Sequence, residues 1–126
     1  AYAPEKYEYP INRYAMEVKR QLDVLDQRLA DNQYLCGDEY TIADMANVAW
    51  YGALVSGILY EAGDFLEVSG YTNVVRWAQQ IQQRPAVKRG QRVNRAWGDE
   101  SKQLPERHSA SDFEAKLEND SDSSTL

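Results

Sequence analysis

The chain has 126 residues, of which 43% are hydrophobic, and its formal net charge at pH 7 is −6. This length suits one domain with one hydrophobic core, and no apolar run approaches the roughly 20 residues that cross a bilayer. The single cysteine and single histidine, Cys36 and His108, exclude an internal disulfide and disfavour a histidine-based zinc site or a Ser-His-Asp triad. One unpaired thiol favours a reducing cytoplasm, and we expect no metal site.

The acidity is concentrated at the C-terminal end. Residues 99–126 hold eight acids and three bases, a charge of −5, which leaves about −1 for the preceding 98 residues. Nucleic-acid binding is disfavoured because it needs a basic surface. We therefore predict a folded domain over 1–98 and an acidic tail over 99–126 that is largely extended or disordered. The sequence begins without Met or a signal-peptide pattern, so we expect a processed chain or a piece of a longer protein.

The first predicted element is a helix that starts near Pro10 and ends near Asp31-Asn32. Its apolar residues recur at spacings of three and four, as on one face of an amphipathic helix: Ile11, Tyr14, Ala15, Val18, Leu22, Leu25 and Leu29. Charged residues occupy the opposite face, which we expect to be solvated: Arg13, Glu17, Lys19, Arg20, Asp23, Asp26 and Arg28. Pro10 is tolerated in the first turn, where its missing N–H costs nothing.

A second helix is predicted from the stretch "YTIADM". Thr41 is an N-cap candidate and Asp44 its N3 partner, so that the two form a capping box, with Tyr40 and Met45 at the positions of a hydrophobic staple. The sequence is apolar on nearly all sides from Met45 to Leu59, which is typical of a helix at the centre of a bundle.

The remaining elements are also helical. Residues 60–71 favour a loop with a short helical turn, and the next helix starts near residue 72 and ends at Arg84-Pro85. Its buried stripe is predicted to be Val74, Trp77, Ala78 and Ile81. Residues 86–95 permit another helix, and no segment alternates like a strand. The predicted fold class is therefore all-α.

Three stretches resemble the C-terminal helical domain of glutathione transferases. They are "YLCGDEYTIADM", "VVRWAQQIQQRPAVKRG" and, closest to the bacterial nu-class enzymes, "YPINRYAMEVKRQLDVLDQRLADNQYLCGDEYTIADMA". Enzymes of that class use glutathione to reduce disulfides and organic peroxides. The resemblance implies a helical bundle that lacks its first helix and the N-terminal thioredoxin-like domain, which binds most of the glutathione and activates its sulfur.

The resemblance implies a role in the parent enzyme and no activity for this chain alone. The chain would supply the substrate-side wall, one glutathione contact and much of a homodimer interface, and no tightly bound cofactor is expected on it. The missing helix is expected to uncover a stripe formed by Tyr14, Val18, Leu22 and Leu25. The alternative is a stand-alone helical interaction module without catalysis, because an uncovered apolar surface recruits partners.

Arg13 is the one candidate glutathione contact, since the Arg of the "RY" pair has this role in the resembling class and a guanidinium can clamp a carboxylate. The competing interpretation is a solvated Arg paired with Glu17 one turn later. Trp50 and Tyr51 are weak candidates for a substrate pocket, together with Tyr7, Tyr9 and Tyr14, although core or interface positions are favoured for most of these aromatic residues.

Three other features favour structural interpretations. A catalytic role for Asp44 is not needed, because the capping box explains it. Cys36 is expected to be a small buried side chain rather than a redox thiol. A row of basic residues is expected to be a solvated face rather than a site for an anionic partner or for the acidic tail: Arg84, Lys88 and Arg92, with Arg89 and Arg95 alongside.

Overall fold

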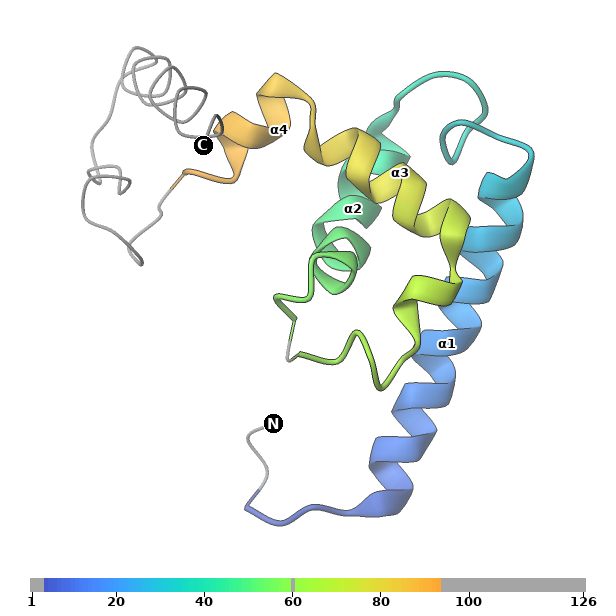
Figure 1. Cartoon of the computed structure of the whole chain (residues 1–126), viewed down its shortest axis with the longest axis vertical. Coiled ribbons are helices and arrows are strands. Elements are labelled where there is room, and N and C mark those ends of the chain that lie inside the picture. The colour runs from blue at the N-terminus through green and yellow to red at the C-terminus, as the bar shows by residue number, and fades with distance from the viewer. Residues whose placement is uncertain (1–3, 60, 94–126) are drawn as a thin grey trace, which may run out of the picture. The chain divides into compact units, whose positions relative to one another are not determined.

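A computed structural model describes residues 4–59 and 61–93, which fall into two units divided between Gln82 and Gln83. The first unit holds helix α1 (Glu8–Ala30), helix α2 (Ile42–Val55), a short 3₁₀ turn η1 (Val68–Gly70) and helix α3 (Thr72–Gln82) (Figure 1). The second unit holds helix α4 (Pro85–Gly90). The boundary predicted at residue 98 and the acidic tail both lie outside the described residues.

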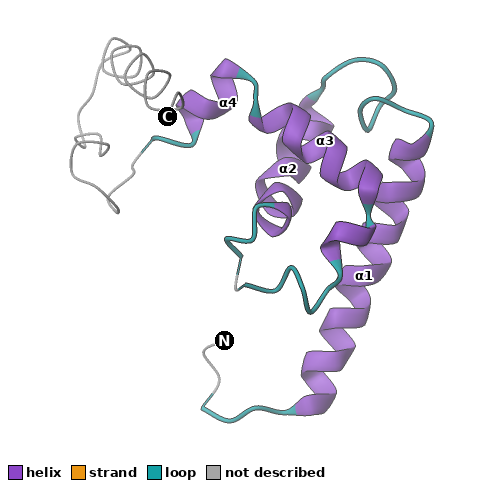
Figure 2. Cartoon of the chain, viewed as in Figure 1, coloured by secondary structure: helices purple, strands orange, loops and turns teal. Residues whose placement is uncertain are grey.

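The part of the chain that the structure describes consists of helices and loops, as Figure 2 shows, and its one β-type contact is an isolated bridge between Tyr34 and Gly37. This confirms the all-α class. Helix α3 packs against both α1 and α2. Its predicted stripe belongs to the core: Val74, Trp77, Ala78 and Ile81 are fully buried, as are Leu22 and Leu29 of α1.

Helix α2 begins at the predicted capping box. The backbone N–H of Thr41 donates to Asp44 Oδ2 at 2.9 Å, and the N–H of Ala43 donates to Thr41 Oγ1 at 3.3 Å. The ring of Tyr40 packs edge-to-face on Tyr34, with 5.7 Å between the centroids. The entry into α2 is therefore fixed by hydrogen bonds and an aromatic contact together.

Helix α2 ends at Val55, four residues earlier than the apolar sequence predicts. Gly57, at φ +70°, allows its N–H to donate to Leu54 O and the N–H of Ile58 to donate to Ala53 O, a Schellman motif. The amide of Gln82 on α3 donates to Gly52 O at 3.0 Å and to Ser56 Oγ at 2.8 Å. The last carbonyls of α2 are therefore satisfied by the turn at Gly57 and by the Gln82 side chain, and the chain leaves the helix at this point.

Helix α2 also departs from the predicted bundle centre, because one of its faces is open. Ile42 is 80% exposed and Trp50 is 70% exposed, with Met45 between them half exposed. Helix α3 packs on another face of α2, where Gly52 is buried beside the Gln82 side chain. In the described residues, α2 is therefore covered on one side only.

The stripe predicted to be uncovered on α1 is only partly open. Tyr14 is 72% exposed, but Leu22 is fully buried and both Val18 and Leu25 are half-buried. The prediction was wrong for Leu22 because α3 crosses α1 at this level and covers it. What remains open on α1 is mainly its N-terminal half.

Two charged side chains, Asp26 and Arg76, join the C-terminal part of α1 to the first turns of α3. Asp26 accepts hydrogen bonds from the backbone N–H groups of Asn73 and Val74 at 2.8 and 3.1 Å, and from the Asn73 amide at 3.0 Å. In return, Arg76 of α3 donates to the carbonyls of Leu29, Asn32 and Gln33 at the end of α1. Asp26 was predicted on the solvated face, and instead it caps another helix.

Two further predictions were wrong. Cys36 is exposed, because Tyr34 and Gly37 bond each other's backbone at 2.8 and 3.1 Å and turn the residues between them at the surface. Arg92, in the second unit, is only 5% exposed, so it is not part of a solvated basic row. Arg84, Lys88 and Arg89 are exposed as predicted.

Candidate functional site

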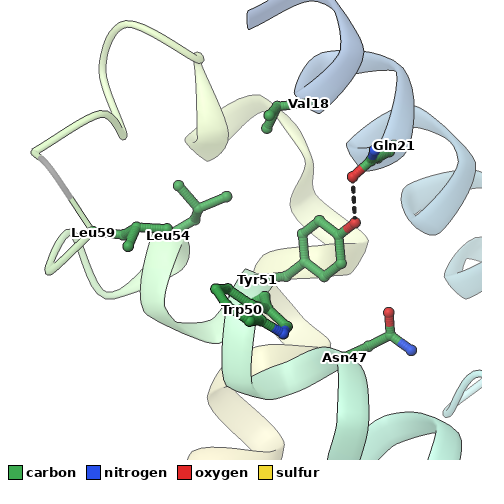
Figure 3. A pocket seen from close by; sticks show the side chains of 7 residues that line it. All are labelled: Val18, Gln21, Asn47, Trp50, Tyr51, Leu54 and Leu59. Atoms are coloured by element: carbon green, nitrogen blue, oxygen red, sulfur yellow. Dashed lines mark hydrogen bonds between the residues drawn. The ribbon is translucent and has the colours of Figure 1, made fainter. Parts of the chain in front are cut away.

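A pocket of about 380 Å³ opens between α1 and α2 (Figure 3). Both helices contact α3, and the space between them is lined by side chains of α1, of α2 and of the loop that follows α2: Val18, Gln21, Asn47, Trp50, Tyr51, Leu54 and Leu59. Most of these side chains are apolar, and the polar groups among them are two amides, one phenol and the indole N–H of Trp50. The pocket therefore suits an apolar ligand oriented by a few hydrogen bonds.

The two candidate pocket residues, Trp50 and Tyr51, both line this pocket. Tyr51 is half-buried, and its hydroxyl donates to Gln21 Oε1 at 2.8 Å, as the dashed line in Figure 3 marks. Burial, with the nearby charge of Glu17, raises the pKa of Tyr51. The other aromatic candidates, Tyr7, Tyr9 and Tyr14, are well exposed and do not line it.

Arg13 lies on the exposed face of α1, one turn before Glu17. The ion pair of the competing interpretation does not form: the Glu17 carboxylate instead accepts from Arg20 Nη2 at 2.6 Å and from Gln21 Nε2 at 3.0 Å. The hydrogen bond from Arg20 is the largest cause that lowers the pKa of Glu17 to about 2, and the charge of Arg13 adds to it. Arg13 thus presents its guanidinium to solvent while its neighbour is engaged elsewhere.

Asp44 is fully buried and accepts four hydrogen bonds. Besides the two from Thr41, it accepts from the N–H of Leu35 at 2.9 Å and from the indole of Trp77 at 2.8 Å. Burial alone would raise the pKa of the Asp44 carboxyl, but these donors outweigh it and the pKa is lowered. A carboxylate held in this way is ionised and fully occupied, which fits a structural role.

Other kinds of site find no support in the described residues. No group of three or more His, Cys, Asp or Glu side chains in 4–59 and 61–93 is arranged to hold a metal ion. Among the same residues, no helix combines the length and apolarity that spanning a membrane requires. Cys36, the one thiol, is exposed on its turn and does not line the pocket.

Five of the pocket residues were not assigned to a pocket from the sequence: Val18, Gln21, Asn47, Leu54 and Leu59. Val18 and Gln21 lie on α1, among positions that were assigned to a buried stripe or left without a role. The pattern of α1 alone contains no signal for them, because the pocket exists only where α2 stands beside α1. A polar residue within one turn of an apolar stripe is the one local hint for Gln21.

The sequence matches the family "Glutathione S-transferase, C-terminal domain" over residues 6–85. That match covers more than half of the chain, which therefore belongs to this family. It confirms the fold class and the family resemblance that the sequence motifs indicated.

Individual relatives agree with this assignment. The chain is 56% identical over 117 residues to the disulfide-bond oxidoreductase YghU of Escherichia coli, a match that covers 93% of this chain and 41% of that protein. It is 34% identical over 99 residues to the disulfide-bond oxidoreductase YfcG of Escherichia coli, covering 78% of this chain and 42% of the relative.

A solved structure is similar as well. Glutathione transferase YghU from Streptococcus pneumoniae, complexed with glutathione, superposes with a TM-score of 0.71 at 60% identity, over 73% of this chain and 36% of that one. The chain thus spans about two-fifths or less of the length of these relatives.

Proposed function

We propose that this chain is the C-terminal helical part of a glutathione-dependent enzyme that reduces disulfides or peroxides. The similarity to a disulfide-bond oxidoreductase over 93% of the chain carries the proposal. The glutathione in the similar solved structure supports glutathione as the cofactor of the whole protein. In this proposal, a thioredoxin-like domain binds and activates glutathione, the helical domain over 1–98 supplies the substrate-side wall, and the enzyme acts in the cytoplasm.

The open face of α2 supports a partner for this domain. Ile42, Met45 and Trp50 leave an apolar strip in water, and such strips mark surfaces that another domain or subunit covers. We assign this strip and the exposed N-terminal half of α1 to contacts with the thioredoxin-like domain and with a second subunit of a homodimer. Trp50 would then stand at the edge of both the interface and the pocket.

The isolated chain is expected to give no appreciable glutathione-dependent turnover of disulfides or peroxides. Its described residues contain no thiol in the pocket and no activated nucleophile beside it. The test compares the isolated chain with the protein expressed from its full reading frame, using glutathione and a small organic disulfide. A rate for the isolated chain near that of the longer protein would contradict the proposal.

Arg13 is the proposed glutathione contact of this domain. In the longer protein, Arg13→Gln is expected to raise KM for glutathione by about tenfold or more, because a hydrogen bond to a charged partner contributes about 1.5–3 kcal/mol. Arg13 is exposed and forms no ion pair in the described structure, so the fold should be unaffected.

Lys6→Gln is the matched control for Arg13. It removes another exposed cation near the start of α1 and should leave KM for glutathione within about twofold, the small effect expected of screened surface charge. Equal KM values for the Arg13 variant and this control would remove Arg13 from the proposed binding site, without bearing on the family assignment.

A docking module without catalysis is the second candidate, and the exposed apolar strip of α2 favours it. The two candidates differ in the upstream reading frame. A thioredoxin-like coding region fused to this domain favours the enzyme, whereas a frame that encodes the helical domain alone favours the module.

A further inference from the structure

The second unit, Gln83–Leu126, contains two stretches of opposite charge that follow one another in the sequence. Residues 83–98 hold five bases and no acid, a charge of +5, and residues 99–126 hold eight acids and three bases, a charge of −5. Residues 1–82 hold six bases and twelve acids, a charge of −6. The small net charge of the first 98 residues is therefore the difference between an acidic first unit and a basic segment, residues 83–98.

Helix α4 shows what the described part of this basic segment presents to its surroundings. Arg84 is the N-cap residue of α4, and Lys88 and Arg89 lie in its last turn. All three side chains are exposed. They form a cationic surface on a helix of six residues, and such a surface attracts anionic groups that come within about a Debye length of it.

Arg92 shows that the cations of the basic segment are not all solvated. Its side chain is only 5% exposed. Charged side chains are almost never fully buried unless they are paired, and carboxylates are the acceptors that also offset the charge of a guanidinium. Residues 83–93 contain no carboxylate, and the first one that follows Arg92 in the second unit is Asp99. The burial of Arg92 therefore favours an acidic stretch as the cover of this segment.

We propose that the acidic tail, residues 99–126, binds to the basic segment around α4 of the same chain and shields it from other anions. The charges of the two stretches are equal in size and opposite in sign. The tail also follows the basic segment directly, so its effective concentration there is on the order of millimolar, which a separate anionic partner must exceed. This inference does not depend on the proposed enzymatic function.

The acidity of the tail is greatest over residues 112–122, which hold five acids and one base. An unbound flexible chain from Arg92 to Ser121 has a root-mean-square span of roughly 30 Å, so that stretch would spend little time beside α4. Binding by charge would bring it into contact with Lys88 and Arg89. The distance between the acidic stretch and α4 thus distinguishes a bound tail from an unbound one.

The test measures this distance by NMR in the full chain of 126 residues. A nitroxide label is placed between Asp120 and Asp122 by Ser121→Cys, with Cys36→Ser to remove the other thiol. The label should broaden the backbone N–H signals of Lys88, Arg89 and Arg92 at low salt. Broadening should fall several-fold in about 1 M NaCl, where the Debye length is only about 3 Å. Broadening no greater at low salt than at high salt would overturn the proposal.

Two pairs of substitutions separate a specific contact from general charge attraction. Lys88→Gln with Arg89→Gln removes two cations of α4 and should reduce the broadening at Arg92 by about half or more, because two of the five bases of the segment are lost. Lys6→Gln with Arg13→Gln is the matched control: it removes two exposed cations of the first unit, changes the net charge equally and should leave the broadening as it was. Circular dichroism checks that both variants are folded. Equal broadening in the two pairs would contradict a site on α4.

Two further measurements exclude other occupants. In a mixture of spin-labelled chain and isotope-labelled chain without the nitroxide, broadening at α4 would assign the contact to the tail of a second copy and overturn binding within one chain. A short DNA duplex serves as the competing anion. If the duplex shifts the N–H signals of Lys88 and Arg89 while the spin label does not broaden them, the basic segment faces an external anionic partner and the proposal fails.

Discussion

Replacement of Asp44 by asparagine is expected to lower the free energy of unfolding by about 3–5 kcal/mol. The carboxylate accepts bonds at both oxygens, from Leu35 and Trp77 at one and from Thr41 at the other. An amide of the same shape places its NH₂ against two of these donors, so buried N–H groups lose their acceptor. The loss is a large share of the roughly 5–15 kcal/mol by which domains are stable.

Urea unfolding followed by far-ultraviolet circular dichroism measures this loss. Asp38→Asn is the matched control, because Asp38 is an exposed carboxylate in the turn before α2 and should shift stability by less than about 0.5 kcal/mol. If the Asp44 variant does not fold, Thr41→Ala tests the same capping box, and it is expected to lower the free energy of unfolding by about 0.5–2 kcal/mol. A stability of Asp44→Asn equal to that of Asp38→Asn would contradict the structural role.

The Asp44 carboxylate also makes the free energy of unfolding depend on pH in the acidic range. Its pKa in the folded chain is lowered below the value near 3.9 of an unfolded aspartate, so the unfolded state binds a proton more readily. The stabilisation is therefore complete above about pH 4–5 and declines as the pH falls through the lowered pKa. Asp44→Asn should remove this part of the acid dependence, which unfolding curves below pH 5 can detect.

Local signals in the sequence were sufficient for the parts of the fold that depend on neighbours in the chain. The capping box needs only residues three apart, and the stripe of α3 needs only a helical period. Both are present, with Val74, Trp77, Ala78 and Ile81 fully buried. The Schellman end of α2 is also local, and Ser56-Gly57 is its signal, but the apolar residues beyond it were taken as more helix.

Long-range contacts were the parts that could not be predicted. Asp26 has the spacing of a solvated residue, and only the crossing of α3 over α1 turns it into a cap. Trp77 has the spacing of a core residue, and nothing local shows that its indole N–H reaches Asp44. Cys36 was expected to be buried because no base or second cysteine near it in the sequence supports a redox role, but a tight turn holds it at the surface.

In the candidate site, too, local features could be predicted from the sequence and long-range contacts could not. Trp50 and Tyr51 were proposed from composition and resemblance, and the structure places both at one pocket. Gln21, which lines that pocket beside Tyr51, lies on another helix, and its hydrogen bond with Tyr51 joins residues 30 positions apart in the sequence. The role of Arg13 is not decided by its exposed position and stays a prediction.

Replacement of Asp26 by alanine is expected to cost about 2 kcal/mol of stability. Asp26 is the cap of α3, although it belongs to α1: it accepts from the first free N–H groups of α3 and from the Asn73 side chain. Its negative charge also lies at the positive end of the helix dipole. Without it, the N–H groups of the half-buried Asn73 and the fully buried Val74 lose their acceptor.

Asp23→Ala is the matched control for Asp26, because it removes a carboxylate one turn earlier on the same helix, where the side chain is exposed. Its expected effect is below about 0.5 kcal/mol. Asp26→Asn should fall between the two alanine variants, since an amide oxygen can still accept from both backbone N–H groups but carries no charge for the dipole. Urea unfolding of the three variants gives the order, and equal losses for Asp23→Ala and Asp26→Ala would show that α3 does not depend on a cap from α1.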